Sequence, residues 1–170
     1  MMKKQRLKRS WIEESILYLL FAGVLVFAVD TWRTKDIPTF DVPHLAGNSL
    51  SGQYLDVMEM SKDEPVIVYF WATWCAACKF VTPTVDWFSN HYQVIGVSLN
   101  SGSDERVRRY MAAKDYTFDN INDLRGEISK QWGIAVTPTI AIIKDGEIKS
   151  VTSGITTPVG LIARLWMTKF

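Results

Sequence analysis

YFWATWCAACKF, residues 69–80, contains both cysteines of the 170-residue chain, Cys75 and Cys78, within a frame of aromatic side chains. The run that leads into it, residues 65–71, is continuously apolar and rich in β-branched side chains, which is typical of a strand covered on both faces. Residues 75–92 follow with helical periodicity, and their expected buried stripe is Val81, Val85 and Phe88. The cysteines are therefore expected where a buried strand gives way to a helix.

The spacing of the two cysteines favours a reactive dithiol. A thiol in the first turn of a helix lies near unpaired N–H groups and the positive end of the helix dipole, which lower its pKa and favour the thiolate. We expect Cys75 to occupy this position and to act as the nucleophile. Cys78 lies one turn further along the same face, so it is placed to resolve the mixed disulfide that Cys75 forms.

A structural staple, a zinc site and a Cu(I) site are the other roles open to this pair. A disulfide between residues three apart closes a very small loop, so it stabilises the fold little. A zinc site needs two further ligands, and the chain offers only His44 and His91, without the spacing of a zinc finger. Two thiolates alone suit Cu(I), so a copper-handling module is the strongest alternative. We assign no metal ligand.

The composition excludes other classes of protein. The net charge is +1, whereas a nucleic-acid-binding protein carries a strong basic excess, so no nucleic-acid partner is expected. Two cysteines are too few for a small fold built on disulfides, so a hydrophobic core must stabilise this one. The length suits one compact domain of ordinary size.

Four segments are predicted from the charge and hydropathy of the chain. Residues 1–10 hold a basic cluster that predicts a cytoplasmic N-terminus, and residues 11–29 form an apolar transmembrane signal anchor. Residues 30–37 are expected to be a linker, and residues 38–170 the folded domain beyond the membrane. A cleaved signal peptide is the alternative to the anchor, since Val26-Phe27-Ala28 is a tolerable cleavage site.

The rest of the domain alternates between expected strands and helices and ends with a hairpin and a helix. Asp145-Gly146 between two strand-like runs signals a two-residue hairpin turn, and Ser101 with Asp104 forms a capping box. The predicted elements are a turn at 47–48 with a short strand near Leu50, a helix at 53–60, a strand at 93–100, a helix from the capping box to Lys114, a short helix at 127–132 ended by Gly133, strands at 139–144 and 147–152, and a helix capped by Thr157 with the inner face Leu161, Ile162, Leu165 and Trp166. This order implies an α/β fold with a mixed central sheet and helices on both sides.

Two motifs carry a resemblance to a known family. FWATWCAACK, residues 70–79, and Val136-Thr137-Pro138-Thr139, about sixty residues later, are similar to the pattern of the thioredoxin superfamily. The anchored layout resembles the membrane-anchored TlpA/ResA-like thiol–disulfide oxidoreductases, and within them the suppressors of copper sensitivity of Gram-negative bacteria. The resemblance implies a thioredoxin-like fold behind an N-terminal transmembrane helix.

The resemblance also implies roles for individual residues. Cys75 and Cys78 match the nucleophile and the resolving thiol, and Pro138, preceded by Thr137, matches a cis-proline beside Cys75. Thr137, Pro138 and Trp74 are then expected to form the substrate-binding surface, where the Thr137 backbone pairs with an extended substrate segment. The supporting residues are Trp71, Ala76, Ala77 and Pro83, of which Pro83 matches a proline that kinks the helix.

Three positions depart from the family pattern. Tyr69 and Val81 stand where relatives carry acids that relay the proton of the buried thiol, which is a general acid–base task. Water, the Tyr69 hydroxyl or another group is left as the proton route. Ala76-Ala77 adds neither charge nor a side-chain hydrogen bond between the cysteines, so the direction of electron flow stays open.

The resulting functional prediction is a CAAC thiol–disulfide oxidoreductase tethered to the bacterial inner membrane and facing the periplasm. We expect it to reduce or exchange disulfides of envelope proteins, with a membrane thiol–electron transporter as a further partner. No cofactor is expected, because the electrons reside in the Cys75–Cys78 pair. A Cu(I)-handling module without turnover, or a holdase that only binds peptides, are the alternative functions.

Overall fold

The computed structural model of the chain describes residues 3–34, 37 and 42–168. They fall into two compact units, residues 1–35 and residues 36–170. Part of the expected linker, residues 35 and 36, and the expected start of the domain, residues 38–41, lie outside the described residues.

The first unit is a single helix, α1 (Lys3–Thr34). It contains a 20-residue stretch, Glu13–Trp32, with a mean hydropathy of 1.9, which is long and apolar enough to cross a membrane. The helix continues through residues 30–34, where the sequence predicts a linker. The apolar side chains described in this stretch are exposed, so no protein core covers them.

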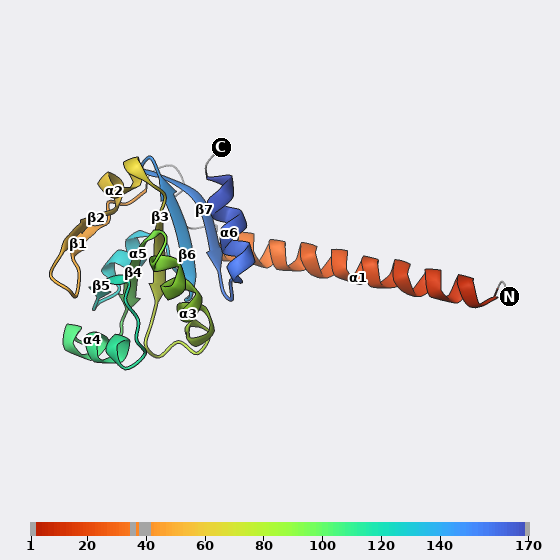
Figure 1. The fold of residues 1–170 in the computed structure, drawn as a ribbon, viewed down its shortest axis with the longest axis horizontal. Helices are drawn as coiled ribbons and strands as arrows, with labels where there is room; N and C mark the ends of the chain where they lie inside the picture. The colour runs from red at the N-terminus through yellow and green to blue at the C-terminus, as the bar shows by residue number, and fades with distance from the viewer. Residues whose placement is uncertain (1–2, 35–36, 38–41, 169–170) are drawn as a thin grey trace. The chain divides into compact units, whose positions relative to one another are not determined.

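The second unit is built on a five-stranded mixed sheet with the order β5-β4-β3-β6-β7 (Figure 1). Its strands are β3 (Val66–Trp71), β4 (Gln93–Leu99), β5 (Asp119–Asp123), β6 (Thr139–Lys144) and β7 (Glu147–Ser153). The pairs β3–β4 and β4–β5 are parallel, whereas β3–β6 and β6–β7 are antiparallel. The α/β class with a mixed central sheet, predicted from the sequence, is confirmed.

Strand β3 lies at the centre of this sheet, and all six of its residues are buried. Its side chains alternate between two cores, because successive residues of a strand point to opposite faces of the sheet. One core joins Ile67, Tyr69 and Trp71 to α3 (Cys78–Ser89), α4 (Asp104–Ala112) and α6 (Pro158–Met167). The other joins Val66, Val68 and Phe70 to α2 (Val57–Asp63) and to Trp132, the residue that ends α5 (Glu127–Gln131).

The segment before β3 folds differently from the prediction. Residues 47 and 48, expected in a turn, belong to β1 (Ala46–Asn48), which pairs antiparallel with β2 (Tyr54–Asp56). The turn lies between these strands, around Leu50. The expected helix at 53–60 is wrong in its first turn, because the Asp56 carboxylate accepts hydrogen bonds from the N–H groups of residues 58 and 59 and so starts α2 at Val57.

Two helix starts lie later than predicted. Helix α3 begins at Cys78, so Cys75 stands in the turn before the helix and not in its first turn. Helix α4 begins at Asp104 and is capped by Ser103, whose Oγ accepts from the N–H of Arg106, so the capping box at Ser101 is wrong. Ser101 is buried instead, and its hydroxyl accepts a hydrogen bond from the N–H of Thr73 at 3.0 Å.

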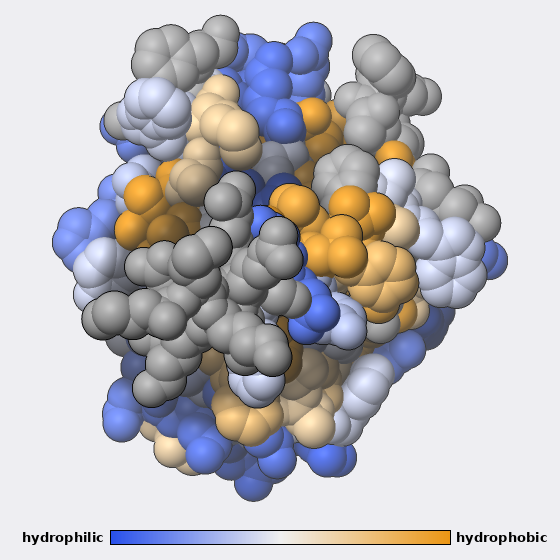
Figure 2. Space-filling model, turned by 90° about the vertical axis from the view of Figure 1, so that its right-hand side faces the viewer, coloured by the Kyte–Doolittle hydropathy of each residue, from blue (hydrophilic) through white to orange (hydrophobic). Residues whose placement is uncertain are grey.

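The last helix and the hairpin before it follow the sequence more closely. Asp145 and Gly146 both have positive φ, as the two-residue hairpin turn between β6 and β7 requires. In α6 only Leu161 and Leu165 are buried, so the predicted inner face was too wide: Ile162 and Trp166 lie one position further round the helix and are exposed. Figure 2 shows one face of the molecule, on which hydrophobic and hydrophilic groups lie side by side.

Strand β5 has no counterpart in the prediction. Its sequence, DNIND, has no continuous apolar run, and Ile121 is its single strand-forming residue, yet Asn120 and Asp123 are buried in it. The strand is held by pairing with β4, and its Asn120 faces the middle of β4 at Gly96. A side chain at Gly96 has no space, because its Cβ would lie 2.5 Å from Phe118 Cε2 and 2.7 Å from Asn120 Oδ1.

We therefore predict that Gly96→Ala lowers the free energy of unfolding by about 1–3 kcal/mol, the usual cost of overpacking a core. Urea unfolding of the full chain in detergent micelles, followed by tryptophan fluorescence, measures this. Gly47→Ala is the matched control, since a Cβ there meets only the Ile121 side chain at 3.9 Å, an ordinary contact distance. Equal stability of the two variants would contradict the close packing of β4 on β5.

Candidate functional site

The two cysteines lie where β3 leaves the core and α3 begins. They form a disulfide with a Cα–Cα distance of 5.3 Å. The N–H of Cys75 donates to the carbonyl oxygen of Ala72 at 3.2 Å, which ties the turn to the end of β3. Both cysteines are nearly enclosed, with exposed fractions of 6% for Cys75 and 2% for Cys78, so the predicted nucleophile is the less buried residue of the two.

The first N–H of helix α3 points at the sulfur of Cys75. The distance from the Cys78 nitrogen to Cys75 Sγ is 3.1 Å. The residue before the helix, Ala77, has no side chain that can accept a hydrogen bond from the helix N-terminus, and Ala76 provides none either. The sulfur therefore takes the position of a capping group, where the N–H group and the helix dipole favour a negative charge on it.

A loop far along the chain closes the other side of Cys75. The peptide bond between Thr137 and Pro138 is cis, and the Thr137 carbonyl oxygen lies 3.5 Å from Cys75 Sγ. In the disulfide the sulfur carries no proton, so this is a contact; a reduced thiol has a proton to donate there. The loop is held by the N–H of Gly154, which donates to the Pro138 carbonyl oxygen at 2.7 Å.

Trp71 supports the site from within the core. Its indole N–H donates to Asn120 Oδ1 at 2.8 Å, and the Asn120 amide donates to Ser98 Oγ at 3.0 Å. The Ser98 hydroxyl in turn donates to Asn122 Oδ1 at 2.9 Å. This chain of hydrogen bonds connects the last residue of β3 to β4 and β5, so the end of β3 is fixed against both strands.

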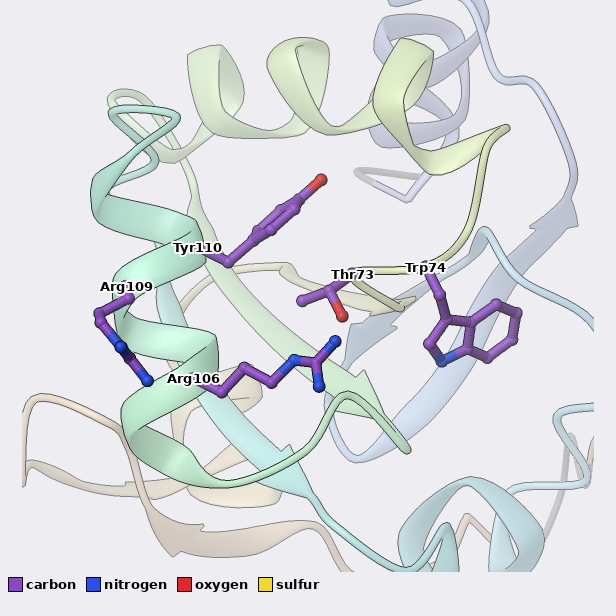
Figure 3. Close-up of a pocket in the computed structure, with 5 residues that line it drawn as sticks. All are labelled: Thr73, Trp74, Arg106, Arg109 and Tyr110. Carbon is purple, nitrogen blue, oxygen red and sulfur yellow. The ribbon is translucent and has the colours of Figure 1, made fainter.

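Trp74 lies at the surface beside the disulfide. Its side chain is exposed, and its indole N–H donates to the carbonyl oxygen of Asn100 at 3.1 Å. The indole borders a pocket of about 440 Å³ that the prediction did not include, lined by Thr73, Trp74, Arg106, Arg109 and Tyr110 (Figure 3). Arg106 and Arg109 of α4 thus line a pocket together with Trp74, the residue before Cys75.

Tyr69 is buried and holds α3, not the cysteine sulfurs. The Thr82 hydroxyl donates to the Cys78 carbonyl oxygen at 2.7 Å, so its single proton is used there. The Tyr69 hydroxyl, 2.8 Å from Thr82 Oγ1, must therefore donate to it. Burial raises the pKa of the Tyr69 phenol well above its usual value of 10, so the phenol keeps its proton at neutral pH and is a poor proton acceptor.

The remaining predicted positions surround this centre. Val81 is fully buried in the core under α3, where an acid would lack a partner among the apolar side chains of that core. Pro83 lies inside α3 on its exposed side. Lys79 is exposed at the start of the helix. The structure thus brings Cys75, Cys78, Thr137 and Pro138 together, with Trp74 at the rim.

The sequence reasoning missed the polar residues that position the site. Asn120 holds Trp71, Asn100 holds Trp74 and Ser101 holds Thr73, each across a large distance in the chain. Asn100 has a positive φ of 44°, which asparagine tolerates better than most residues. Asn100 stands at the end of the strand predicted at 93–100, which could have marked it as a loop residue. Its partner Trp74, however, cannot be inferred from the spacing of residues in the sequence.

Comparisons with known proteins agree with this geometry. The model of the AhpC/TSA family matches residues 34–151. A thioredoxin-like protein of Haemophilus influenzae is 32% identical over 170 residues, covering 99% of each chain, and the thiol–disulfide oxidoreductase ResA of Oceanobacillus iheyensis is 28% identical, covering 91% of this chain and 87% of its own. The crystal structure of StoA from Bacillus subtilis superposes with a TM-score of 0.64 at 24% identity, over 75% of this chain and 98% of that one. The predicted thioredoxin-like fold is confirmed.

The contacts of Tyr69 generate a prediction. Tyr69→Phe removes the hydrogen bond between Tyr69 and the buried Thr82 hydroxyl, so the free energy of unfolding at pH 7 falls by about 1–2 kcal/mol while the rate of disulfide exchange is unchanged. The stability that the phenol contributes is complete below its unfolded pKa, near 10, and is lost as the pH rises above it. Wild type therefore loses about 1.4 kcal/mol per pH unit more than the variant above pH 10.

Urea unfolding of the full chain in micelles between pH 7 and about 11 tests this. Tyr54→Phe is the control, because Tyr54 is exposed and its loss should change neither stability nor pH dependence. A fall in exchange rate with unchanged stability would show instead that the Tyr69 hydroxyl relays protons.

Proposed function

This chain belongs to the AhpC/TSA family, and we propose from that premise that it is a membrane-tethered thiol–disulfide oxidoreductase acting on disulfides of envelope proteins. The observation that carries the reaction class is the placement of Cys75 Sγ, with the Cys78 N–H at 3.1 Å and the Thr137 carbonyl at 3.5 Å. Relatives whose names state thiol–disulfide oxidoreductase, such as ResA, support the same class. The structure holds the oxidised form of the pair.

The first step of the proposed reduction uses the dithiol form. Cys75 loses its proton, and its thiolate attacks one sulfur of a substrate disulfide. The substrate S–S bond breaks, a bond forms between Cys75 and the attacked sulfur, and the other substrate sulfur leaves as a thiolate that takes up a proton. The N–H of Cys78, which lies 3.1 Å from Cys75 Sγ in the oxidised pair, is positioned to stabilise the attacking thiolate.

The second step releases the product. Cys78 loses its proton, and its thiolate attacks Cys75 Sγ. The mixed disulfide breaks, and the second substrate sulfur leaves as a thiolate that takes up a proton. Two electrons have then passed to the substrate, and the Cys75–Cys78 disulfide is the oxidised product on the enzyme. The half-buried backbone of Thr137 offers its peptide groups to an extended substrate during both steps.

The pair needs a source of electrons for each cycle. We assign this to a dithiol partner, and a membrane thiol–electron transporter fits a tethered enzyme because tethering raises the effective concentration of a membrane partner. No cofactor takes part in this scheme, since the two electrons reside in the cysteine pair. The proton acceptor of Cys78 is not Tyr69, whose hydroxyl is engaged with Thr82.

The tether is proposed to be α1. The 20 residues Glu13–Trp32 form a helix about 30 Å long, which matches the hydrocarbon core of a bilayer. Basic residues precede it in the sequence and predict that the N-terminus stays in the cytoplasm, so the cysteine domain faces the periplasm of the inner membrane. Disulfide chemistry persists in that compartment.

The exchange mechanism predicts different outcomes for the two cysteines. Cys78→Ser keeps the nucleophile but removes the resolving thiol, so mixed disulfides with envelope proteins accumulate through Cys75. Cys75→Ser forms none. Non-reducing electrophoresis of membranes from cells that express each full-length variant, followed by mass spectrometry of the captured partners, measures both.

The alternatives give other results in the same experiment. A Cu(I)-handling module traps no partner in either variant and loses Cu(I) binding equally in both. A holdase retains its peptide binding when both cysteines are replaced. Either result, with no mixed disulfide through Cys75, would overturn the proposed reaction.

The tether predicts the behaviour of the full chain in the cell. The protein should stay in the membrane fraction after extraction with alkaline carbonate, and its intact mass should include residues 1–28. Protease added to spheroplasts should digest the cysteine domain, because that domain faces the outside of the inner membrane. A soluble product that lacks residues 1–28 would show that the helix is a cleaved signal peptide.

A further inference from the structure

The pocket beside Trp74 is lined by aromatic side chains and by two arginines, of which Arg106 extends toward Thr73 and Arg109 points away from it (Figure 3). Its lining residues come from the turn after β3 (Thr73, Trp74) and from α4 (Arg106, Arg109, Tyr110). Trp74 directly precedes Cys75 in the chain, so the pocket borders the turn that carries the nucleophile. Figure 3 shows the Arg106 side chain extending from α4 toward Thr73, with the Trp74 indole beyond it.

The loop from β4 to α4 holds this arrangement. Its Asn100 and Ser101 bond to Trp74 and Thr73 respectively, so the loop is docked on the turn that carries Cys75. The next residue, Gly102, has a φ of 93°, and a Cβ there would lie 2.7 Å from Arg106 Cδ. The stem of Arg106 therefore packs on the bare backbone of Gly102, which directs its guanidinium into the pocket before any ligand binds.

The charges around the pocket leave Arg106 available. Glu105 is shared by Arg108 and Arg109, at 3.6 Å and 3.5 Å, and within the described part of the chain no carboxylate forms an ion pair with Arg106. Asp104, the other acid in this turn of α4, has its Oδ1 engaged by the Asn122 amide at 2.8 Å. A planar guanidinium with free donors suits a carboxylate.

We propose that this pocket binds an acidic side chain, Asp or Glu, close in sequence to the substrate cysteine that Cys75 attacks, with Arg106 as the main specificity residue. The inference rests on the proposed function, since it names the substrate class of the same site. The Trp74 and Tyr110 rings offer apolar contact to the neighbouring residues of the substrate, while Arg106 and Arg109 attract its charge. Such complementary charge acts mainly on encounter and register.

The test compares two disulfide-bonded peptides that differ only near the cysteines, one with Asp and Glu and one with Asn and Gln. The reduced full chain in detergent is mixed with each peptide, and acid-quenched samples are analysed by mass spectrometry. Wild type should reduce the acidic peptide about three- to fivefold faster at low salt, as expected for partly exposed ion pairs. The preference should shrink at high salt.

Variants identify the source of the preference. Arg106→Gln should remove most of the difference in rate between the acidic and the amide peptide, and Arg109→Gln should remove less of it, because Arg109 already pairs with Glu105. Lys62→Gln is the control for the loss of one positive charge. Lys62 is exposed on α2, and α2 packs on the other face of the sheet from α4. Equal rates on both peptides in wild type, or a preference that survives Arg106→Gln, would overturn the proposal.

A second measurement separates this proposal from the reaction itself. Calorimetry of the oxidised full chain with a cysteine-free acidic hexapeptide, and with its amide counterpart, needs no turnover. Selective binding of the acidic peptide that is lost in Arg106→Gln supports the pocket even if no disulfide is reduced, in which case only the proposed function fails. Reduction of both peptides without selective binding refutes the pocket and leaves the proposed function intact.

Discussion

The burial of β3 on both faces is the constraint on which the rest of the domain depends. Six consecutive residues contribute alternately to two cores, so the strand cannot shift by one position without exposing one apolar set and misplacing the other. Its last residue, Trp71, is fixed further by the hydrogen bond to Asn120. The turn that carries Cys75 begins at the next residue, and its position is therefore set by the most rigid part of the molecule.

Helix α3 then determines what the turn can do chemically. The helix is anchored under its first turns by Val81 and by the hydrogen bonds of Thr82 with Tyr69 and with the Cys78 carbonyl. Because Ala77 offers no capping side chain, the first helical N–H is free to point at the Cys75 sulfur. Tyr69 and Val81, which stand where the family pattern has acids, thus share one role. Both hold α3 in place, Tyr69 through its hydrogen bond to Thr82 and Val81 through its burial in the core.

Hydrophobic pattern and turn chemistry predict the elements that apolar burial dictates. Residues 65–71, the Val81 stripe of α3 and the turn at Asp145-Gly146 belong to this class, since each depends on local sequence alone. Strand β5 escaped prediction because its polar residues find their partners only after the chain has folded. Asn120 and Asn122 bond to Ser98 on β4, and Asp123 accepts from N–H groups of α5. The start of α4 was misplaced because two serines compete for one cap, and contact of Ser101 with Thr73 decides in favour of Ser103.

The site also has one part that local sequence predicts, the dithiol with Thr137 and Pro138, and one part that depends on long-range contacts, the pocket beside Trp74. The dithiol, Thr137 and Pro138 could be placed from spacing and resemblance, whereas the pocket beside Trp74 depends on a loop that long-range hydrogen bonds dock on the turn. Asn100 and Gly102 adopt positive φ in that loop, which brings the chain back across Thr73 and turns α4 so that Arg106 faces Trp74. Arg106, the residue proposed to bind the substrate, therefore comes from α4, a helix that contains no cysteine. Charge in this loop and helix can therefore change which substrates are chosen without altering the contacts that hold Cys75.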